Sequence, residues 1–396
     1  MGTRVNEASV KFFFPFWFED QICEGYDPWS EICPDPSDKR FVWELGWSRF
    51  PFDGILISRP NLEGKPEWLE KCTRVGVSRA LRIPQGISTF GDCGAWSYID
   101  EKEPPYDPIE TLDFYAKMRF SLACSVDHII LPQTLRERYR RLAITLRNAG
   151  KMKSKWDSDR ERYGYELVGV VQGWDPQSYH DSAKEILDMG YRSIALGGQA
   201  RSPSRTTFNI LRRCYDLWRG KKINVHIFGI ARKNLLGAYR RFGVTSFDNA
   251  YHRRAWMSAT NNYEIGDSGY TAIRIPISKR VGEERLPGEL RVFDALKGLE
   301  DGKLSGKQFL RVLRSYDSRG VGRFLGEYSR TLRDKPWTRC DCPMCKVGIH
   351  VCVFRGNQRN MRRGFHNLNN FYNSFKEFEG AKSGNPGRSA LESVIF

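Results

Sequence analysis

Residues 166–198 read ELVGVVQGWDPQSYHDSAKEILDMGYRSIALGG and contain one complete strand–helix–strand unit. The run 166–171 is apolar and rich in valine, which is typical of a buried strand. A stripe with helical spacing follows, formed by Tyr179, Ala183, Ile186 and Leu187. Gly190 then offers a place for the helix to end, and residues 193–196 form a second apolar run. The stretch predicts two parallel strands joined by a helix.

The same alternation of apolar runs and helical patterns extends over most of the chain. Further runs occupy residues 52–58, 86–90, 126–131, 223–228 and 244–247. We expect an eighth strand at residues 41–45 or 79–83. Repeated strand–helix units favour a closed (β/α)8 barrel of the TIM type, in the α/β class, over an open doubly wound sheet. No strand–GxGxxG–helix fingerprint of a dinucleotide-binding domain is present.

One intervening segment shows helical spacing clearly. Its apolar stripe lies on a stretch otherwise rich in arginine and consists of Leu135, Tyr139, Leu142 and Leu146. This spacing predicts an amphipathic helix with the stripe toward the core.

The pattern changes after about residue 280, so we expect three parts. Residues 1–280 would form the barrel with an N-terminal extension, and residues 281–380 a helical subdomain that contains a cluster of cysteines. Residues 381–396 are rich in Gly, Ser and Ala and predict a poorly ordered tail. A length of 396 residues suits a barrel with an appendage.

The charge balance indicates a polyanionic partner. Lys and Arg number 63 against 47 Asp and Glu, a formal charge of +16, which points to nucleic acid. An ordinary basic surface is the alternative. No apolar run is long enough to span a membrane. The apolar segment 12–18 is interrupted by proline, unlike a signal peptide.

The cysteines divide into a tight cluster and scattered thiols. Cys340, Cys342 and Cys345 stand at C-x-C-x-x-C spacing, which favours structural zinc over an iron–sulfur cluster. The candidates for a fourth ligand are His350, Cys352 and His366. The other cysteines lie far apart along the chain, so we expect free thiols and a reducing, cytoplasmic location.

Polar residues and glycines follow the predicted strands. In a (β/α)8 barrel, strand ends meet at one mouth, where the chemistry takes place. The residues at these ends include Asp92, Gln172, Gly197, Gly198 and Asp248. Two carboxylates beside one anomeric carbon suit double displacement, and glycines let a flat ligand approach the backbone.

These strand ends and the cysteine cluster resemble the tRNA-guanine transglycosylase superfamily in its barrel-plus-zinc form. The matching motifs occur in the family's order over most of the chain. They are Asp92-Cys-Gly-Ala-Trp96, Gly169-Val-Val-Gln-Gly173, Leu196-Gly-Gly198, Gly243-Val-Thr-Ser-Phe-Asp248 and Cys340-Asp-Cys-Pro-Met-Cys345 with His366-Asn-Leu368.

The resemblance implies a role for each residue. Asp248 would be the nucleophile that forms a covalent glycosyl intermediate, and Asp92 the general base for the incoming 7-deazapurine. Gln172, Gly197 and Gly198 would bind the base. The His-Asn-Leu context selects His366 as the fourth zinc ligand.

The chain departs from the family pattern in three places. The family carries an acid that contacts the purine edge where this chain has Ile130-Leu-Pro-Gln133, so no carboxylate is expected at that position. Asp127 lies five residues before Pro132 and is not expected to face the pocket, which leaves Gln133 as the substitute. Residues 249–256 and the short gap between Cys345 and His366 also differ. These departures resemble the branch that acts on DNA, the DpdA-type DNA-guanine transglycosylases of 7-deazaguanine modification.

The expected activity is therefore exchange of guanine in DNA for a 7-deazaguanine base, with 7-cyano-7-deazaguanine (preQ0) as the expected free base. The alternatives are a tRNA-guanine transglycosylase of the queuosine or archaeosine type, or an inactive zinc-dependent nucleic-acid-binding protein. An ATPase partner would help to open the duplex. Candidate phosphate contacts are Arg253, Arg254, Arg355, Arg359, Arg362 and Arg363. Trp96 and Trp256 are candidates for base stacking.

Overall fold

The structure, a computed structural model, describes residues 9–131, 134–230 and 232–380. The chain divides into two compact units. The first takes in the chain up to Phe18, Phe52–Ala250 and the segment from Phe375, and the second consists of Glu19–Pro51 and Tyr251–Ser374. The domain boundary near residue 280 stays a prediction, and the predicted tail of residues 381–396 lies outside the described residues.

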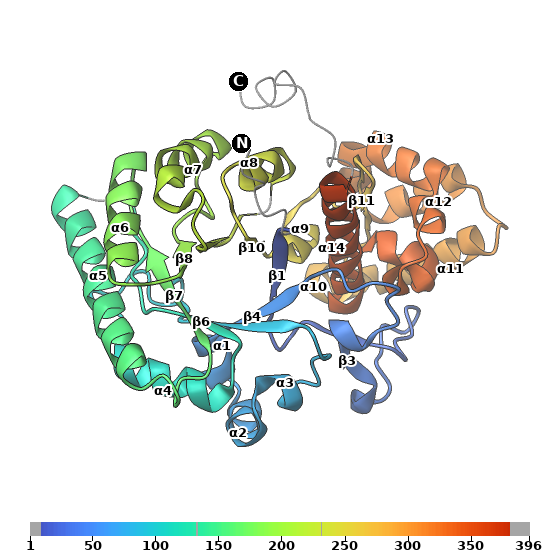
Figure 1. Ribbon diagram of the computed structural model, residues 1–396. Helices are drawn as coiled ribbons and strands as arrows, with labels where there is room; N and C mark the ends of the chain where they lie inside the picture. Colours follow the sequence, from blue (N-terminus) through green and yellow to red (C-terminus); the bar gives the residue numbers. More distant parts are fainter. Residues whose placement is uncertain (1–8, 132–133, 231, 381–396) are drawn as a thin grey trace. The chain divides into compact units, whose positions relative to one another are not determined.

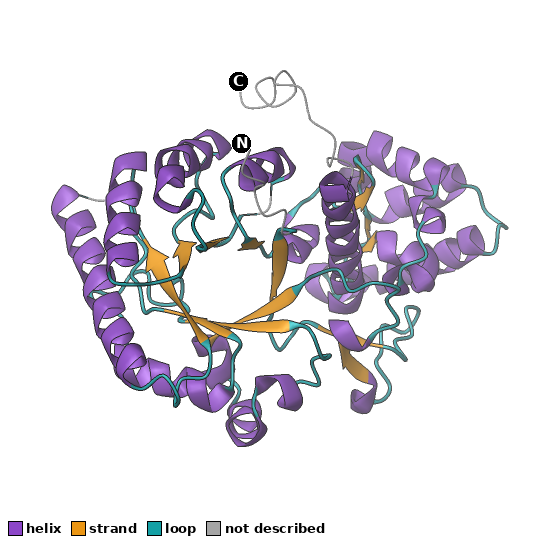
Figure 2. Cartoon of the chain, viewed as in Figure 1, coloured by secondary structure: helices purple, strands orange, loops and turns teal. Residues whose placement is uncertain are grey.

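The first unit contains a closed barrel of eight parallel strands (Figures 1 and 2). In chain order the strands are β1 (Lys11–Pro15), β4 (Gly54–Ser58), β5 (Ser88–Asp92), β6 (Leu122–Cys124), β7 (Glu166–Val171), β8 (Ser193–Leu196), β9 (Asn224–Ile227) and β10 (Ser246–Asp248). β1 closes the ring by pairing with both β10 and β4. The predicted α/β, TIM-type fold is confirmed.

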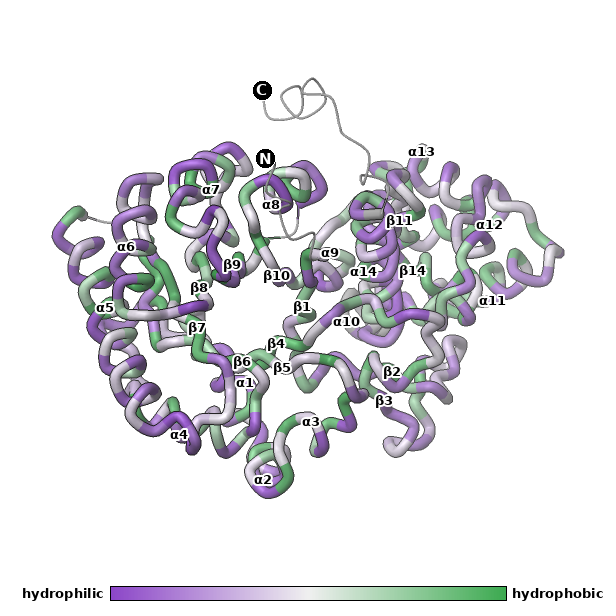
Figure 3. Tube along the Cα trace, viewed as in Figure 1, coloured by the Kyte–Doolittle hydropathy of each residue, from purple (hydrophilic) through white to green (hydrophobic). Residues whose placement is uncertain are grey.

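From β4 onward, helices connect successive barrel strands and lie outside the ring (Figure 2). They are α1 (Arg59–Glu63), α2 (Pro66–Val75), α3 (Val77–Ala80), α4 (Pro108–Met118), α5 (Leu135–Ser158), α6 (Pro176–Asp188), α7 (Ser204–Trp218) and α8 (Leu236–Arg241). Asp107 and Asp175 cap α4 and α6 by accepting backbone N–H groups, and a proline follows each cap. Strands β4 and β7 are mostly hydrophobic, whereas α5 is mostly hydrophilic (Figure 3).

The eighth strand is not where the sequence analysis placed it. β1 occupies the phenylalanine-rich segment 11–15, and its last four residues are buried. Residues 79–83 are the end of α3 and a turn, and residues 41–45 belong to the second unit. The prediction failed because three consecutive phenylalanines show no alternation, although a strand buried on both faces needs none.

The strand predicted at residues 126–131 is also wrong. The strand before α5 is β6, Leu122–Cys124, and residues 125–131 are irregular but mostly buried. Burial made this stretch as apolar as a strand, which periodicity alone does not distinguish.

Helix α5 exists as predicted, but it buries a different face. Leu135 and Tyr139 are 61% and 60% exposed. The buried residues are Arg141, Ile144, Thr145, Asn148, Ala149, Met152 and Lys153. Polar contacts made by Arg141 and Thr145, described below, hold this face inward.

The second unit combines short sheets with helices. Its sheets pair β2 (Gln21–Cys23) with β3 (Lys39–Phe41), β11 (Tyr263–Ile265) with β12 (Ser268–Tyr270), and β13 (Ile273–Arg274) with β14 (Val353–Phe354). Its helices are α9 (Arg254–Met257), α10 (Ser278–Val281), α11 (Leu286–Glu300), α12 (Gly306–Tyr316), α13 (Ser318–Asp334) and most of α14 (Asn357–Gly380). Val292, Leu296, Phe309 and Leu313 are in its core.

The second unit also contains a disulfide that the sequence analysis did not predict. Cys23 and Cys33 form a disulfide, whereas the sequence analysis took both as free thiols. The segment between them turns back on itself through an Asp27–Ile32 bridge, which brings two cysteines ten positions apart within a Cα–Cα distance of 6.0 Å. No described helix has both the length and the apolar composition needed to cross a membrane.

Candidate functional site

Three carboxyl groups, called the acid cluster below, gather at the C-terminal mouth of the barrel: Asp92, Asp127 and Asp248. Asp92 ends β5, Asp248 ends β10, and Asp127 follows β6. Burial raises the pKa of Asp92 to about 7, and the negative charges of Asp127 and Asp248 contribute. The charge of Asp248 thus influences the pKa of Asp92, so the two aspartates predicted from the sequence interact electrostatically.

Asp248 is held by two donors that act on one oxygen. Its Oδ1 accepts the Gly229 backbone N–H at 3.0 Å and contacts His226 Nε2 at 3.1 Å. The other ring nitrogen of His226 lies 2.9 Å from Ser246 Oγ. The sequence analysis missed His226, although a polar residue within the apolar run 223–228 was an available signal.

Asp92 is positioned by the turn after β5. Its Oδ2 accepts the Gly94 N–H at 3.1 Å, and the Cys124 thiol lies 3.7 Å from Oδ1. Gly94 has a φ of 78°, and a Cβ there would lie 2.4 Å from Pro60. Only glycine therefore lets this turn bring its N–H to Asp92.

Asp127 faces the same site, which corrects the sequence analysis. It is 4% exposed, and its carboxylate accepts Gln172 Nε2–H at 2.6 Å and the Cys93 thiol at 3.1 Å. Burial raises its pKa. Because β6 ends earlier than predicted, a carboxylate does stand beyond this strand. Gln133, the predicted substitute, lies outside the described residues.

The residues predicted to bind the base lie against one another. Gln172, just after β7, is fully buried, and its Oε1 has no hydrogen-bond partner among the described residues. A Cβ on Gly197 would lie 2.3 Å from Gln172 Nε2, and one on Gly198 would lie 3.0 Å from Oε1. The glycines therefore leave space for an amide that still has an acceptor to offer.

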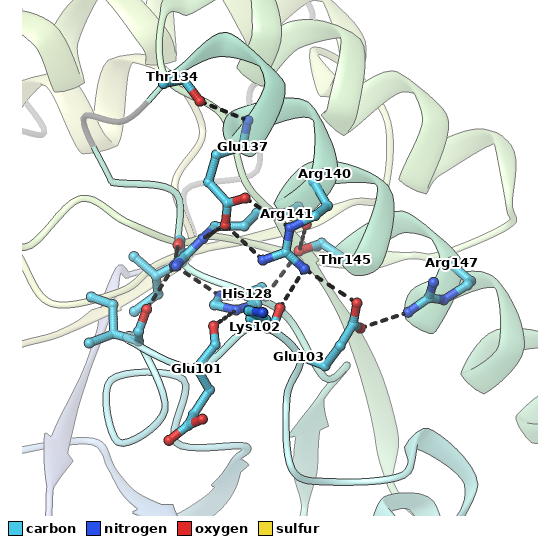
Figure 4. A network of polar contacts seen from close by, with 12 residues as sticks. Glu101, Lys102, Glu103, His128, Thr134, Glu137, Arg140, Arg141, Thr145 and Arg147 are labelled. Carbon is cyan, nitrogen blue, oxygen red and sulfur yellow. Dashed lines mark hydrogen bonds and ion pairs between the residues drawn. The ribbon is translucent and has the colours of Figure 1, made fainter.

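Helix α5 holds the backbone of the segment that follows Asp127 in place. Figure 4 shows Arg141 and Thr145 of this helix next to His128. Arg141 donates to the carbonyls of Ile99 and Ile129, each at 2.8 Å, and also contacts His128 Nδ1. The His128 N–H donates to Thr145 Oγ1. These contacts tie the segment after Asp127 and the segment after Tyr98 to the same helix. The Tyr98 hydroxyl in turn donates to the Asp127 carbonyl.

Trp96 lies on the turn after Asp92 and is 45% exposed. The Arg201 guanidinium lies over its ring at 5.2 Å. Trp256, the other predicted stacking residue, is half-buried beneath Arg253 at 5.3 Å. Of the two, Trp96 therefore offers more ring surface to a ligand.

The second unit contains a metal-compatible site, called the thiol cluster below: Cys340, Cys342, Cys345 and His366. The His366 Nδ1 lies 3.4, 3.6 and 3.3 Å from the three sulfurs. The His366 Nε2 is 2.6 Å from the Glu264 carbonyl, which can only accept. Nε2 therefore carries the proton, and the lone pair of Nδ1 points toward the sulfurs, as a metal ligand requires. This buried cluster could bind a metal ion.

The two other candidates for the fourth ligand are not part of this cluster. His350 packs edge-on against Trp29, and burial lowers its pKa to about 3. Cys352 is buried, and burial raises its pKa.

Arg253 and Arg254 are the predicted phosphate contacts that reach the surface. Arg253 is partly exposed and pairs with the buried Asp20 at 3.1 Å. Arg254 is exposed, with its guanidinium over Tyr251.

The predicted phosphate contacts on α14 are interior residues, and their burial argues against that role. Arg359 and Arg363 are fully buried, and Arg362 is 5% exposed. Arg359 pairs with Glu31, Arg362 donates to the Cys23 carbonyl, and Arg363 donates to three backbone carbonyls. Arg355 is likewise buried, between Glu31 and Glu289. A buried charge needs such partners, so these side chains are engaged inside the fold.

Comparison with known proteins now adds to the geometry. No family model matches the chain. The sequence is similar to a curated protein named DNA-guanine transglycosylase, from Salmonella montevideo. The two are 31% identical over an alignment of 362 residues, and the similarity covers 82% of this chain and 86% of that protein. Because this similarity runs through most of both sequences, the chain belongs to the guanine transglycosylase family.

Proposed function

We propose that this protein exchanges guanine in DNA for a 7-deazaguanine base, expected to be 7-cyano-7-deazaguanine, by two displacements at C1′. The observation that carries the proposal is the acid cluster at the barrel mouth of a guanine transglycosylase family member. The exchange needs a nucleophile, a group that transfers protons and an acceptor for the base. Asp248, Asp92 and Asp127 respectively suit these three tasks.

Asp127 and Gln172 are proposed to bind the base. The N1–H and the 2-amino group of guanine and of its 7-deaza analogues donate hydrogen bonds, and a carboxylate can accept both. Adenine has neither of these donors. The partnerless Oε1 of Gln172 adds a buried acceptor beside this carboxylate. Gly197 and Gly198 support this assignment, since larger residues there would collide with Gln172.

In the first displacement, a carboxylate oxygen of Asp248 forms a bond to C1′ while the C1′–N9 bond breaks. The electron pair of that bond leaves with guanine, and the sugar remains as an ester on Asp248. With a pKa of about 7, Asp92 is protonated in a large share of molecules near neutral pH and is suited to protonate the departing base.

In the second displacement, the 7-deazapurine takes the place of guanine. Asp92, now a carboxylate, removes the proton from the ring nitrogen N9, which attacks C1′. The ester bond breaks, and its electron pair returns to the Asp248 carboxylate. A carboxyl group that alternates between acid and base works best when its pKa lies near the working pH.

DNA is the proposed polymer because the Salmonella relative is named for DNA and the chain carries a formal charge of +16. A guanine inside a duplex must first leave the base stack, which costs a few kcal/mol. The exposed ring of Trp96 offers a stacking surface for an unpaired base. An ATPase partner that opens the duplex and a cytoplasmic location stay predictions.

The thiol cluster is proposed to hold Zn²⁺. Three thiolates and one imidazole complete a tetrahedral set and leave no open position, so the ion would stabilise the second unit without taking part in the exchange. It would tie residues 340–345 to α14, which carries His366.

The test is incorporation of labelled 7-cyano-7-deazaguanine by the full chain into DNA or tRNA, with the Asp248→Asn protein as control. Duplex and single-stranded DNA are compared. We expect label in DNA and none with Asp248→Asn. Label in tRNA alone would favour the tRNA branch, and salt-sensitive DNA binding without label in either polymer would favour an inactive zinc-dependent binding protein.

A further inference from the structure

His226 contacts the proposed nucleophile but has no role in the scheme above. It is 3% exposed and lies on β9, next to β10, which carries Asp248. Its ring meets the edges or faces of Phe13, Phe90 and Phe228, with centroids 5.8, 5.1 and 4.7 Å away. A polar ring in such an apolar surrounding requires partners for both nitrogens, and it has them in Ser246 and Asp248.

We propose that His226 is a positioning residue that holds Asp248 by Oδ1 and so presents Oδ2 to C1′. This inference rests on the proposed function, in which Asp248 is the nucleophile. Both donors to Asp248 among the described residues, Gly229 N–H and His226 Nε2–H, act on Oδ1. Oδ2 is the oxygen left to react.

Ser246 sets the tautomer that this role requires. When His226 Nε2–H donates to the carboxylate, Nδ1 is the unprotonated nitrogen and accepts the Ser246 hydroxyl at 2.9 Å. Ser246 and Asp248 lie two residues apart on β10, so a single strand presents the tautomer-setting hydroxyl and the nucleophile to the same ring.

The contact also matters when the intermediate breaks down. As the ester bond between Oδ2 and C1′ breaks, its electron pair returns to the carboxylate. The two donors on Oδ1 stabilise that returning charge without having to move. His226 would therefore assist both displacements without touching the nucleotide, the first by orientation and the second by charge stabilisation.

Three substitutions separate this role from packing. His226→Gln retains an Nε2–H donor at about the position of the imidazole Nε2, whereas the shorter His226→Asn places its amide where Nδ1 was and faces Ser246. His226→Phe retains the ring and loses both polar contacts. A positioning role predicts that the Gln variant is much more active than Asn and Phe, whereas a packing role predicts that Phe is the best of the three.

The measurements are the single-turnover rate of covalent protein–DNA adduct formation, the rate of base exchange and the affinity for labelled free base. For Asn and Phe we expect adduct formation and exchange to fall roughly 10- to 100-fold, because a misplaced nucleophile costs about that much. Gln should recover most of the rate. Free-base affinity, which depends on Asp127 and Gln172, should stay within about twofold in all three variants.

Two results would overturn the inference: Phe reacting as fast as the unaltered protein, or Gln falling as far as Phe. A failure of the proposed function looks different, because then the unaltered protein itself forms no adduct and exchanges no base. Melting curves of each variant accompany the rates, and a variant that does not fold is replaced in the comparison by Ser246→Ala. That change removes only the tautomer-setting hydroxyl, and an undiminished exchange rate in it counts against the inference.

Discussion

The acid cluster and the thiol cluster both collect titratable side chains, but their bonding differs. The acid cluster comes from separate strand ends, and the amide beside it leaves Gln172 Oε1 without a partner. In the thiol cluster, three sulfurs face one imidazole nitrogen while the other nitrogen is bonded to Glu264. One site keeps bonding capacity for a ligand, whereas a single ion would complete the other. This is the difference expected between a reacting site and a structural one.

The largest expected effect is on the acid cluster. Asp248→Asn keeps the size of the side chain and removes the nucleophile, so we expect base exchange to fall by about 10³-fold or more. The melting temperature should change little, because the amide can still accept from Gly229 and His226. The measurement is label incorporation with a melting curve alongside. Exchange near the unaltered rate would remove Asp248 from the mechanism.

The thiol cluster should show the opposite pattern. Cys345→Ser removes one thiolate, so bound zinc, measured by elemental analysis, should be lost. The melting temperature should drop on the order of 10 °C, because metal binding contributes to folding. The matched control is Cys352→Ser, a buried thiol outside the cluster, which should retain the metal. Equal metal content in both variants would contradict the assignment of ligands.

The raised pKa of Asp92 predicts a stability change with pH. Between about pH 4, the ordinary carboxyl range, and pH 7, the folded chain keeps a proton that the unfolded chain has released. Stability should therefore fall as the pH rises through this window and level off above it. Asp92→Asn should remove this dependence and stabilise the protein on the order of 4 kcal/mol at pH 8.

Urea denaturation of both proteins at pH 5 and pH 8 measures this difference. Effects of groups that do not interact with Asp92 are common to the two proteins and cancel in the comparison. A variant that is less stable than the unaltered protein at pH 8 would show that Asp92 is not a strained, buried carboxyl group.

Base recognition should respond to Asp127. Asp127→Asn replaces an acceptor for the two guanine donors by an amide, so we expect the kcat/KM for the free base to fall about 10²-fold. Since the charge of Asp127 also raises the pKa of Asp92, the pH–rate profile should shift toward lower pH. An unchanged pH–rate profile would show that the charge of Asp127 does not influence the pKa of Asp92.

The smallest effect is expected for Trp96, on the turn after Asp92. Trp96→Ala should weaken single-stranded DNA binding about tenfold, because stacking on an aromatic ring contributes about 1–3 kcal/mol. Trp96→Phe is the matched control and should recover most of the affinity. Binding measured by fluorescence anisotropy at fixed salt tests this, and equal affinity of the Ala and Phe variants would exclude stacking at this residue.

Local patterns determined what the sequence revealed by itself. Alternating strand and helix periods predicted the barrel, since each period reflects a backbone geometry that a few neighbouring residues define. The C-x-C-x-x-C spacing predicted the thiol cluster for the same reason. Asp92 and Asp248 were found because both directly end strands, and parallel strands end at one mouth.

Only the tertiary structure placed the remaining parts. β1 comes from a phenylalanine run without alternation, and Asp127 reaches the site from an irregular segment after a three-residue strand. His226 meets Asp248 only because β9 and β10 pair in one register. The arginines of α14 look like surface charges in sequence, yet they are buried with acidic and carbonyl partners. Burial and contact between distant residues depend on how the whole chain packs, which no local period encodes.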